Sequence, residues 1–138
     1  MKRRDFVGLA AAGWVGGCAS LVVTTVRPVN GRVRLSLRDH PLLNRPGGFL
    51  KLRPEGSNQL LYVLALSGGS FAVVSPICKH LGCTVNIDGP RLLCPCHGSM
   101  YDRDGSVLRG PTQAPLDRFQ TEVSSDDVLT IYLEPRRA

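Results

Sequence analysis

Short hydrophobic runs, some of which alternate with polar residues, recur along residues 32–133, and turns rich in glycine, proline and aspartate separate them. In residues 32–37, for example, Val33, Leu35 and Leu37 fall on one face of an extended strand, because successive side chains of a strand point to opposite sides. No stretch has a convincing helical period. The pattern predicts strands at residues 32–37, 49–52, 60–66, 71–75, 84–87, 91–94, 106–108, 119–123 and 128–133. Short strands at this spacing predict an all-β sandwich within residues 32–138.

Residues 1–27 show no such alternation. A Lys-Arg-Arg run at residues 2–4, followed by an uncharged run over residues 6–26, resembles a twin-arginine export signal, a route used by proteins that fold and load cofactors before crossing the membrane. As a helix, the uncharged run would be about 31 Å long, close to the hydrocarbon core of a bilayer. The arginines would stay inside, so we expect the domain on the extracytoplasmic, periplasmic side.

The sequence leaves the fate of this segment open. Cys18 follows a Val-Gly-Gly run that resembles a lipoprotein processing site, although a cysteine is also an ordinary small apolar residue in a membrane helix. The segment is therefore an uncleaved anchor, a signal that leaves a lipid on Cys18, or a signal that is removed entirely. Residues 28–31 form a short linker to the domain.

Composition and charge exclude several classes of protein. Hydrophobic residues at 43% and charged residues at 20% are typical of a globular domain. Of the net charge of +6, residues 1–27 carry +3, from four basic residues and one acidic residue. The remaining chain has no basic stripe with interleaved aromatic residues, so nucleic-acid binding is not expected.

Two segments concentrate the residues that bind metals, 78–83 (CKHLGC) and 94–99 (CPCHGS). Cys78 and His80 are separated by one residue, Cys94 and His97 by two, and thirteen residues lie between His80 and Cys94. One thiolate and one imidazole from each segment suit a [2Fe–2S] centre in which two histidines bind one iron and two cysteines bind the other. A structural zinc site is the main alternative, but zinc motifs usually pair like ligands in each half.

The remaining cysteines, Cys83 and Cys96, occupy matching places in the two segments and could close a disulfide. Disulfides between all four cysteines would leave both histidines of the segments unexplained. Cysteines used in this way favour an oxidising compartment. His40, the third histidine of the chain, lies in a polar turn and receives no function.

The two segments resemble the cluster-binding boxes of the Rieske iron–sulfur proteins, in particular the high-potential, disulfide-bearing branch of cytochrome bc-type complexes. The resemblance covers roughly residues 32–133. It implies three antiparallel sheets, with the boxes as loops at one tip of a small subdomain. It also implies one [2Fe–2S] cluster per chain, a disulfide between Cys83 and Cys96, and four ligands: Cys78, His80, Cys94 and His97.

The resemblance assigns roles to three further residues. Ser99 and Tyr101 match a serine and a tyrosine that donate hydrogen bonds to a bridging sulfide and to a ligand thiolate, here Cys78. Such donors stabilise the reduced cluster, because reduction adds negative charge. Leu81 matches the leucine at the exposed tip where quinol docks.

Two features depart from the family pattern. Residues 110–116 resemble a Gly-Pro-Ala-Pro-Leu loop that covers the cluster, but Thr112 and Gln113 are extra. Lys79 stands where these proteins usually have a threonine, and it adds a positive charge beside the tip. Both departures weaken the inference of a standard cytochrome b partner more than that of the cluster.

The expected function is electron transfer in a membrane-associated complex, from quinol to a c-type haem, with cytochrome b and c-type cytochrome subunits as partners. Alone, the chain is not expected to catalyse a reaction. Two alternatives remain: the small Rieske subunit of an exported molybdenum oxidase such as arsenite oxidase, and a stand-alone periplasmic redox carrier or sensor lipoprotein. The ferredoxin of a cytoplasmic dioxygenase is disfavoured, because such ferredoxins lack the export signal and the extra cysteine pair.

Overall fold

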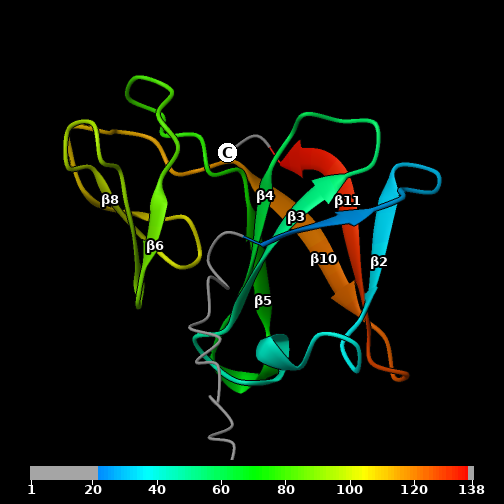
Figure 1. Cartoon of the computed structure of the whole chain (residues 1–138). Helices are drawn as coiled ribbons and strands as arrows, with labels where there is room; N and C mark the ends of the chain where they lie inside the picture. The colour runs from blue at the N-terminus through cyan, green and yellow to red at the C-terminus, as the bar shows by residue number, and fades with distance from the viewer. Residues whose placement is uncertain (1–21, 137–138) are drawn as a thin grey trace, which may run out of the picture.

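The computed structural model describes residues 22–136, and its regular structure is almost entirely β-strand (Figure 1). The larger sheet has the strand order β1-β3-β4-β5-β10-β11-β2, and the smaller has the order β6-β7-β8-β9. The predicted all-β class is confirmed. The strands are β1 Val23–Val26, β2 Arg32–Ser36, β3 Phe49–Pro54, β4 Leu61–Ala65, β5 Phe71–Val74, β6 Asn86–Asp88, β7 Arg91–Leu93, β8 Met100–Asp102, β9 Val107–Arg109, β10 Arg118–Val123 and β11 Val128–Arg136.

Strands β4 and β5 are buried on both faces, and this places two cores back to back. Leu61 and Val63 of β4 belong to the core of the larger sheet. Tyr62 and Leu64 point the other way, into a second core that they share with Leu92 of the smaller sheet. The continuous apolar run at residues 60–66 is explained by this double burial, which leaves neither face of the strand for polar side chains.

The smaller sheet is inserted between two paired strands of the larger one, and it lies beside that sheet in Figure 1. The chain leaves the larger sheet after Val74 and returns at Arg118, and these two residues face each other in the β5–β10 pair. At the crossing, the Ser75 N–H donates to the Asp117 carbonyl at 2.8 Å. We call the two segments that connect the sheets, at Ser75 and at Asp117, the neck. Everything between Ser75 and Asp117 is therefore carried on two adjacent strands.

Arg103 connects the two parts at a second place. Its buried guanidinium donates to the Gly89 carbonyl at 2.7 Å, within the small sheet, and to the Gly48 carbonyl at 2.8 Å, at the start of β3. Gly48 itself must be a glycine, because a Cβ there would lie 1.6 Å from the Leu42 carbonyl oxygen. The smaller sheet is thus fixed by the neck, the second core and this arginine.

The structure differs from the sequence-based expectations in four places. The resemblance implied three antiparallel sheets, but there are two in the described residues, because β10 pairs with β5 on one side and β11 on the other and so joins the layers. Strand β1 lies within the range assigned to the N-terminal segment, and it pairs with β3 in parallel. Strand β8 was not predicted, and two short 3₁₀ turns, Pro41–Asn44 and Ser67–Gly69, were not expected either.

The N-terminal predictions concern mostly residues 1–21, including Cys18, which lie outside the described residues. Within residues 22–136, no helix is long and apolar enough to cross a membrane. Export, anchoring and lipidation therefore stay predictions.

Candidate functional site

Both metal-binding segments are tight turns built in the same way. In the first, the Cys78 N–H donates to the Cys83 carbonyl and the Gly82 N–H returns to the Cys78 carbonyl. In the second, Cys94 pairs with Ser99 and Gly98 in the same pattern. Gly82 and Gly98 both have a φ of 76°, a conformation that glycine adopts without the Cβ clash of other residues. The shared Cys-x-x-x-Gly spacing therefore produces two matching loops.

A disulfide between Cys83 and Cys96 joins these loops, with an S–S distance of 2.00 Å. The pairing expected from the resemblance is confirmed. The sulfur atoms of Cys83, Cys94 and Cys96 all lie within 4.8 Å of one another. Two of these sulfurs are bonded together, so this trio does not form a three-thiolate metal site. Cys94 and Cys78 are the free cysteines of the described residues, and both are buried.

The two histidines lie on the solvent side of the same loops. His80 and His97 are both exposed, and their ring centroids are 4.9 Å apart with the rings perpendicular. The structure thus gathers the four predicted ligands into one region, with two thiols inside and two imidazoles outside. This donor set suits a two-iron cluster with one thiolate-bound iron and one imidazole-bound iron.

Buried hydroxyl groups surround the inner cysteine. Tyr101 is 0% exposed. Its hydroxyl oxygen lies 3.4 Å from the Cys78 Sγ and accepts a hydrogen bond from the Lys79 N–H at 3.2 Å. It donates to the Thr112 Oγ1 at 2.8 Å. The Thr112 N–H in turn donates to the Ser99 Oγ at 3.1 Å. The structure therefore places both predicted tuning residues, Ser99 and Tyr101, in one network around Cys78.

These contacts shift two ionisation equilibria. Burial acts to raise the pKa of the Cys78 thiol, but hydrogen bonds from Tyr101, the His80 backbone, Cys94 and Ser99 together outweigh it, so that the pKa lies below its ordinary value. Burial raises the pKa of Tyr101, and the hydrogen bond to Cys78 raises it further. A lowered thiol pKa favours the thiolate, which is the form that binds a metal.

An ion pair connects the first loop to the neck. The Lys79 Nζ lies 2.7 Å from an Asp117 carboxylate oxygen, and their side chains are 34% and 39% exposed. Leu81, at 64% exposed, projects from the same loop beside His80. Thr112 and Asp117 were not predicted as site residues, because their roles depend on contacts distant in sequence.

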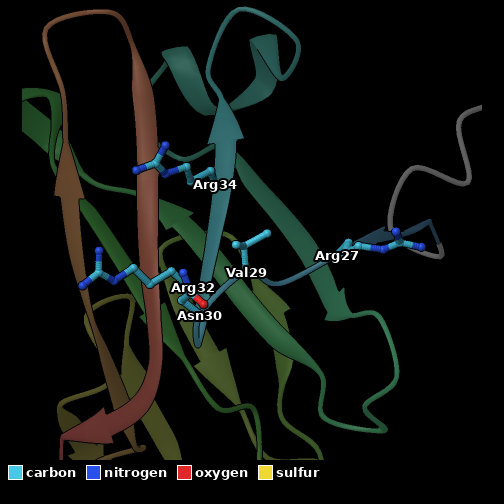
Figure 2. A pocket seen from close by; sticks show the side chains of 5 residues that line it. All are labelled: Arg27, Val29, Asn30, Arg32 and Arg34. Atoms are coloured by element: carbon cyan, nitrogen blue, oxygen red, sulfur yellow. The ribbon is translucent and has the colours of Figure 1, made fainter.

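The cavity drawn in Figure 2 is separate from this region. It has a volume of about 300 Å³ and is lined by Arg27, Val29, Asn30, Arg32 and Arg34, around the start of β2. Its arginines do not converge on one point: Arg27 pairs with Glu55, and Arg32 lies over the Tyr132 ring. The lining offers neither a thiol nor an imidazole, so the metal-binding chemistry belongs to the two loops.

The two thiols and two imidazoles of these loops are the donor set of an iron–sulfur protein with mixed cysteine and histidine ligands. The sequence profile of the Rieske [2Fe–2S] domain matches residues 44–120. This match spans more than half of the chain, and the protein belongs to the Rieske family. It carries electrons through a Rieske-type [2Fe–2S] cluster, as the resemblance implied.

Similar proteins occur in several bacteria. The cytochrome b6-f complex iron–sulfur subunit of Chlorobaculum tepidum is 31% identical over 137 residues, which cover 93% of this chain and 74% of that protein. The menaquinol:cytochrome c reductase iron–sulfur subunit of Bacillus subtilis is 44% identical over 63 residues, 41% of this chain and 38% of that protein.

The solved structures agree on the fold. The plasma membrane Rieske protein PetC3 from Synechocystis PCC 6803 superposes with a TM-score of 0.52 at 30% identity, over 69% of this chain and 90% of that one. A carbazole 1,9a-dioxygenase complex of oxygenase and ferredoxin gives a TM-score of 0.53 at 24% identity, over 68% and 88% of the two chains. At that identity, the second likeness concerns the fold alone.

Proposed function

We propose that this protein is the iron–sulfur subunit of a quinol-oxidising cytochrome bc-type complex, in which it takes electrons from quinol and passes them to a c-type haem. The observation that carries the proposal is the division of the site into buried thiols and exposed imidazoles on disulfide-linked loops. The names of the relatives, which are subunits of such complexes, support it.

In this proposal, the buried Cys78 and Cys94 would hold one iron of the cluster, and the exposed His80 and His97 would hold the other. The bound cluster supplies a one-electron acceptor. Each histidine uses one ring nitrogen for iron and keeps the other at the surface, where a hydrogen-bonding partner can reach it. Quinol gives up protons as well as electrons when it is oxidised. Exposed imidazoles, which can accept a hydrogen bond or a proton, therefore suit quinol as the electron donor. Leu81, prominent on the same loop, would contact the apolar wall of the quinol site.

A high reduction potential follows from the same residues. Neutral imidazoles in place of two thiolates lower the negative charge around the cluster and raise its potential. The buried Tyr101 hydroxyl lies 3.4 Å from the Cys78 Sγ, and hydrogen bonding from the buried Ser99 lowers the pKa of the same thiol, so both residues offer donors near this sulfur. Both effects favour the reduced state of the cluster, as is required of a cluster that oxidises quinol.

We also propose that the domain is exported by the twin-arginine route and held at the extracytoplasmic face of a membrane. With β1 occupying Val23–Val26, the uncharged run that precedes the sheet is residues 6–22, about 26 Å if helical and near the lower limit for a span. A lipid on Cys18 is the alternative tether. Mass spectrometry of the purified protein, compared with a Cys18→Ser variant, distinguishes the two tethers and full release.

Purification of the tagged full-length protein from membranes with its native partners tests the assignment to a complex. Co-purifying b-type and c-type haems, together with reduction of the cluster by added quinol, are the expected result. Molybdenum without b-type haem would instead assign the chain to an exported molybdenum oxidase. A lone two-iron protein would identify a free carrier or sensor.

Histidine variants test the ligand assignment independently of the partners. His80→Ala and His97→Ala should each abolish the optical and electron paramagnetic resonance spectrum of the mixed-ligand cluster. His40→Ala is the matched control, because His40 precedes a 3₁₀ turn outside the two loops and its removal should leave that spectrum unchanged. An unaltered spectrum in either test variant would show that the histidine is not a ligand.

A further inference from the structure

Thr112, one of the two residues of the covering loop that are extra relative to the family pattern, contacts both Ser99 and Tyr101. It is 4% exposed. Its hydroxyl oxygen accepts a hydrogen bond from the Tyr101 hydroxyl at 2.8 Å, and its N–H donates to the Ser99 Oγ at 3.1 Å. Its own hydroxyl proton goes to the Ala114 carbonyl at 3.2 Å. Thr112 is thus a buried junction between Ser99, Tyr101 and the covering loop.

Two acceptors compete for the hydroxyl proton of Tyr101. The phenol has one hydroxyl proton, and two acceptors are within reach, the Thr112 Oγ1 at 2.8 Å and the Cys78 Sγ at 3.4 Å. The Lys79 N–H supplies a proton to the phenol oxygen and needs none from it. Thr112 cannot donate to Tyr101 while its own proton is used by Ala114. The Tyr101 proton therefore goes either to Thr112 or to the sulfur.

Thr112 accepts a hydrogen bond from Tyr101 but donates one to Ser99. Because the Ser99 Oγ accepts the Thr112 N–H, its lone pair on that side is occupied and its own proton is free for another acceptor. Ser99 is also among the groups whose hydrogen bonding lowers the pKa of the Cys78 thiol. A backbone N–H is unchanged by substitution of the side chain, so variants at Thr112 that keep the loop in place alter the Tyr101 contact and leave the Ser99 contact.

We propose that Thr112 is a positioning residue that lowers the reduction potential of the cluster, because its hydroxyl takes the Tyr101 proton away from the ligand sulfur of Cys78. The inference rests on the proposed ligand set. When the sulfur gains negative charge on reduction, it attracts the Tyr101 proton more strongly, but this gain is offset by loss of the hydrogen bond to Thr112. Tyr101 therefore contributes less to the potential than a tyrosine without a competing acceptor.

Thr112→Val tests the proposal, since valine keeps the shape of threonine and removes the acceptor. The midpoint potential of the full-length holoprotein should shift upward. Thr112→Ser keeps an acceptor and should leave the potential near that of the natural protein. Gln113→Ala is the matched control on the same loop, because Gln113 is exposed. Thr112→Ala provides a second variant without the acceptor, in case valine disturbs the loop.

The decisive comparison repeats Thr112→Val in a Tyr101→Phe background. Without the phenol there is no proton to redirect, so the second substitution should no longer move the potential. An unchanged or lowered potential in both Thr112→Val and Thr112→Ala would overturn the proposal, as would an equal shift with phenylalanine at position 101. Resonance Raman spectra in D₂O add a readout of the natural protein: its Fe–S bands should shift less on deuteration than those of Thr112→Val.

Failure of this proposal can be distinguished from failure of the ligand assignment. If the histidine variants described above keep the mixed-ligand spectrum, the assignment of ligands is wrong. If they lose it while the potentials of the Thr112 variants stay fixed, the cluster is placed correctly and the role of Thr112 is wrong.

Discussion

Tyr101→Phe isolates one hydroxyl group at the site, and we expect it to lower the reduction potential while leaving the fold intact. The tyrosine ring belongs to the second core, packed with residues of β4 and β7, and phenylalanine fills the same space. The hydroxyl contributes no apolar contact. Its removal subtracts the contact to Cys78 at 3.4 Å and the hydrogen bonds to Lys79 and Thr112.

The size of the shift follows from how much the contact to Cys78 strengthens on reduction. Reduction places one more negative charge on the cluster, and a hydrogen bond to a charged acceptor is roughly twice as strong as a neutral one. A gain of about 1.4 kcal/mol corresponds to roughly 59 mV for a one-electron couple. Because Thr112 competes for the same proton, this value is a ceiling. We therefore expect a fall of tens of millivolts.

The same substitution should destabilise the protein modestly. The Lys79 N–H loses its acceptor in a part-buried position, and an unsatisfied buried donor costs about 1–3 kcal/mol. A loss of stability could by itself disturb the site, so a control with a similar cost is needed. Tyr62→Phe provides it, because the buried Tyr62 hydroxyl donates only to the Val85 carbonyl, at 2.7 Å.

A redox titration followed by circular dichroism in the visible range gives both midpoint potentials, and chemical denaturation gives both stabilities. Tyr101→Phe should lower the potential, and Tyr62→Phe should lower the stability with the potential unchanged. Equal potentials for Tyr101→Phe and the natural protein would refute the hydrogen-bond argument. Equal shifts in both variants would show that general loosening, and not the contact to Cys78, moves the potential.

Four further predictions use the same measurements. Ser99→Ala should lower the potential by tens of millivolts, because it removes a buried donor beside Cys78; an unchanged titration would contradict this. Cys83→Ser should fold but lose cluster on heating, because a disulfide closing a ring of about fourteen residues contributes at most roughly 3 kcal/mol; iron content after heating, compared with the natural protein, measures it. Lys79→Met should lower the potential and Asp117→Asn should raise it, because each removes one charge of an ion pair beside the first loop; shifts of the same sign would contradict an electrostatic origin. Arg103→Met should lower the free energy of unfolding by about 2–3 kcal/mol, because two part-buried hydrogen bonds from a charged donor to the Gly89 and Gly48 carbonyls are lost; urea denaturation with unchanged stability would exclude the connecting role of this residue.

Local patterns in the sequence predict the frame well and the contacts between distant segments poorly. The apolar run at 60–66 identifies β4, since a strand buried on both faces has no polar alternation. Strand β8 was missed, because its three residues Met-Tyr-Asp have no alternation long enough to recognise. Strand β1 was assigned to the N-terminal segment because its Val-Thr-Thr-Val run continues an uncharged stretch, although β-branched residues favour strands.

The matching loops that present the proposed ligands were predictable for a different reason. Cys78 and Cys94 each stand four residues before a glycine. The glycine that allows the tight loop is therefore close in sequence to the residues that the loop presents. Thr112 and Asp117 carry no such signal. Their partners Tyr101 and Lys79 lie 11 and 38 positions away, and the pairing exists only once the neck and the covering loop are folded.

The loops that hold the ligands contain no regular strand, so their geometry must come from cross-links, and Tyr101 supplies several of them from one atom. Its hydroxyl contacts the first loop at Cys78 and Lys79 and the covering loop at Thr112, while its backbone lies in β8 within the small sheet. One residue of the small sheet thereby contacts both loops. His80 and His97, by contrast, are exposed. This contrast suits the proposed electron carrier, in which the inner ligands would hold the cluster while the outer ones would meet a partner.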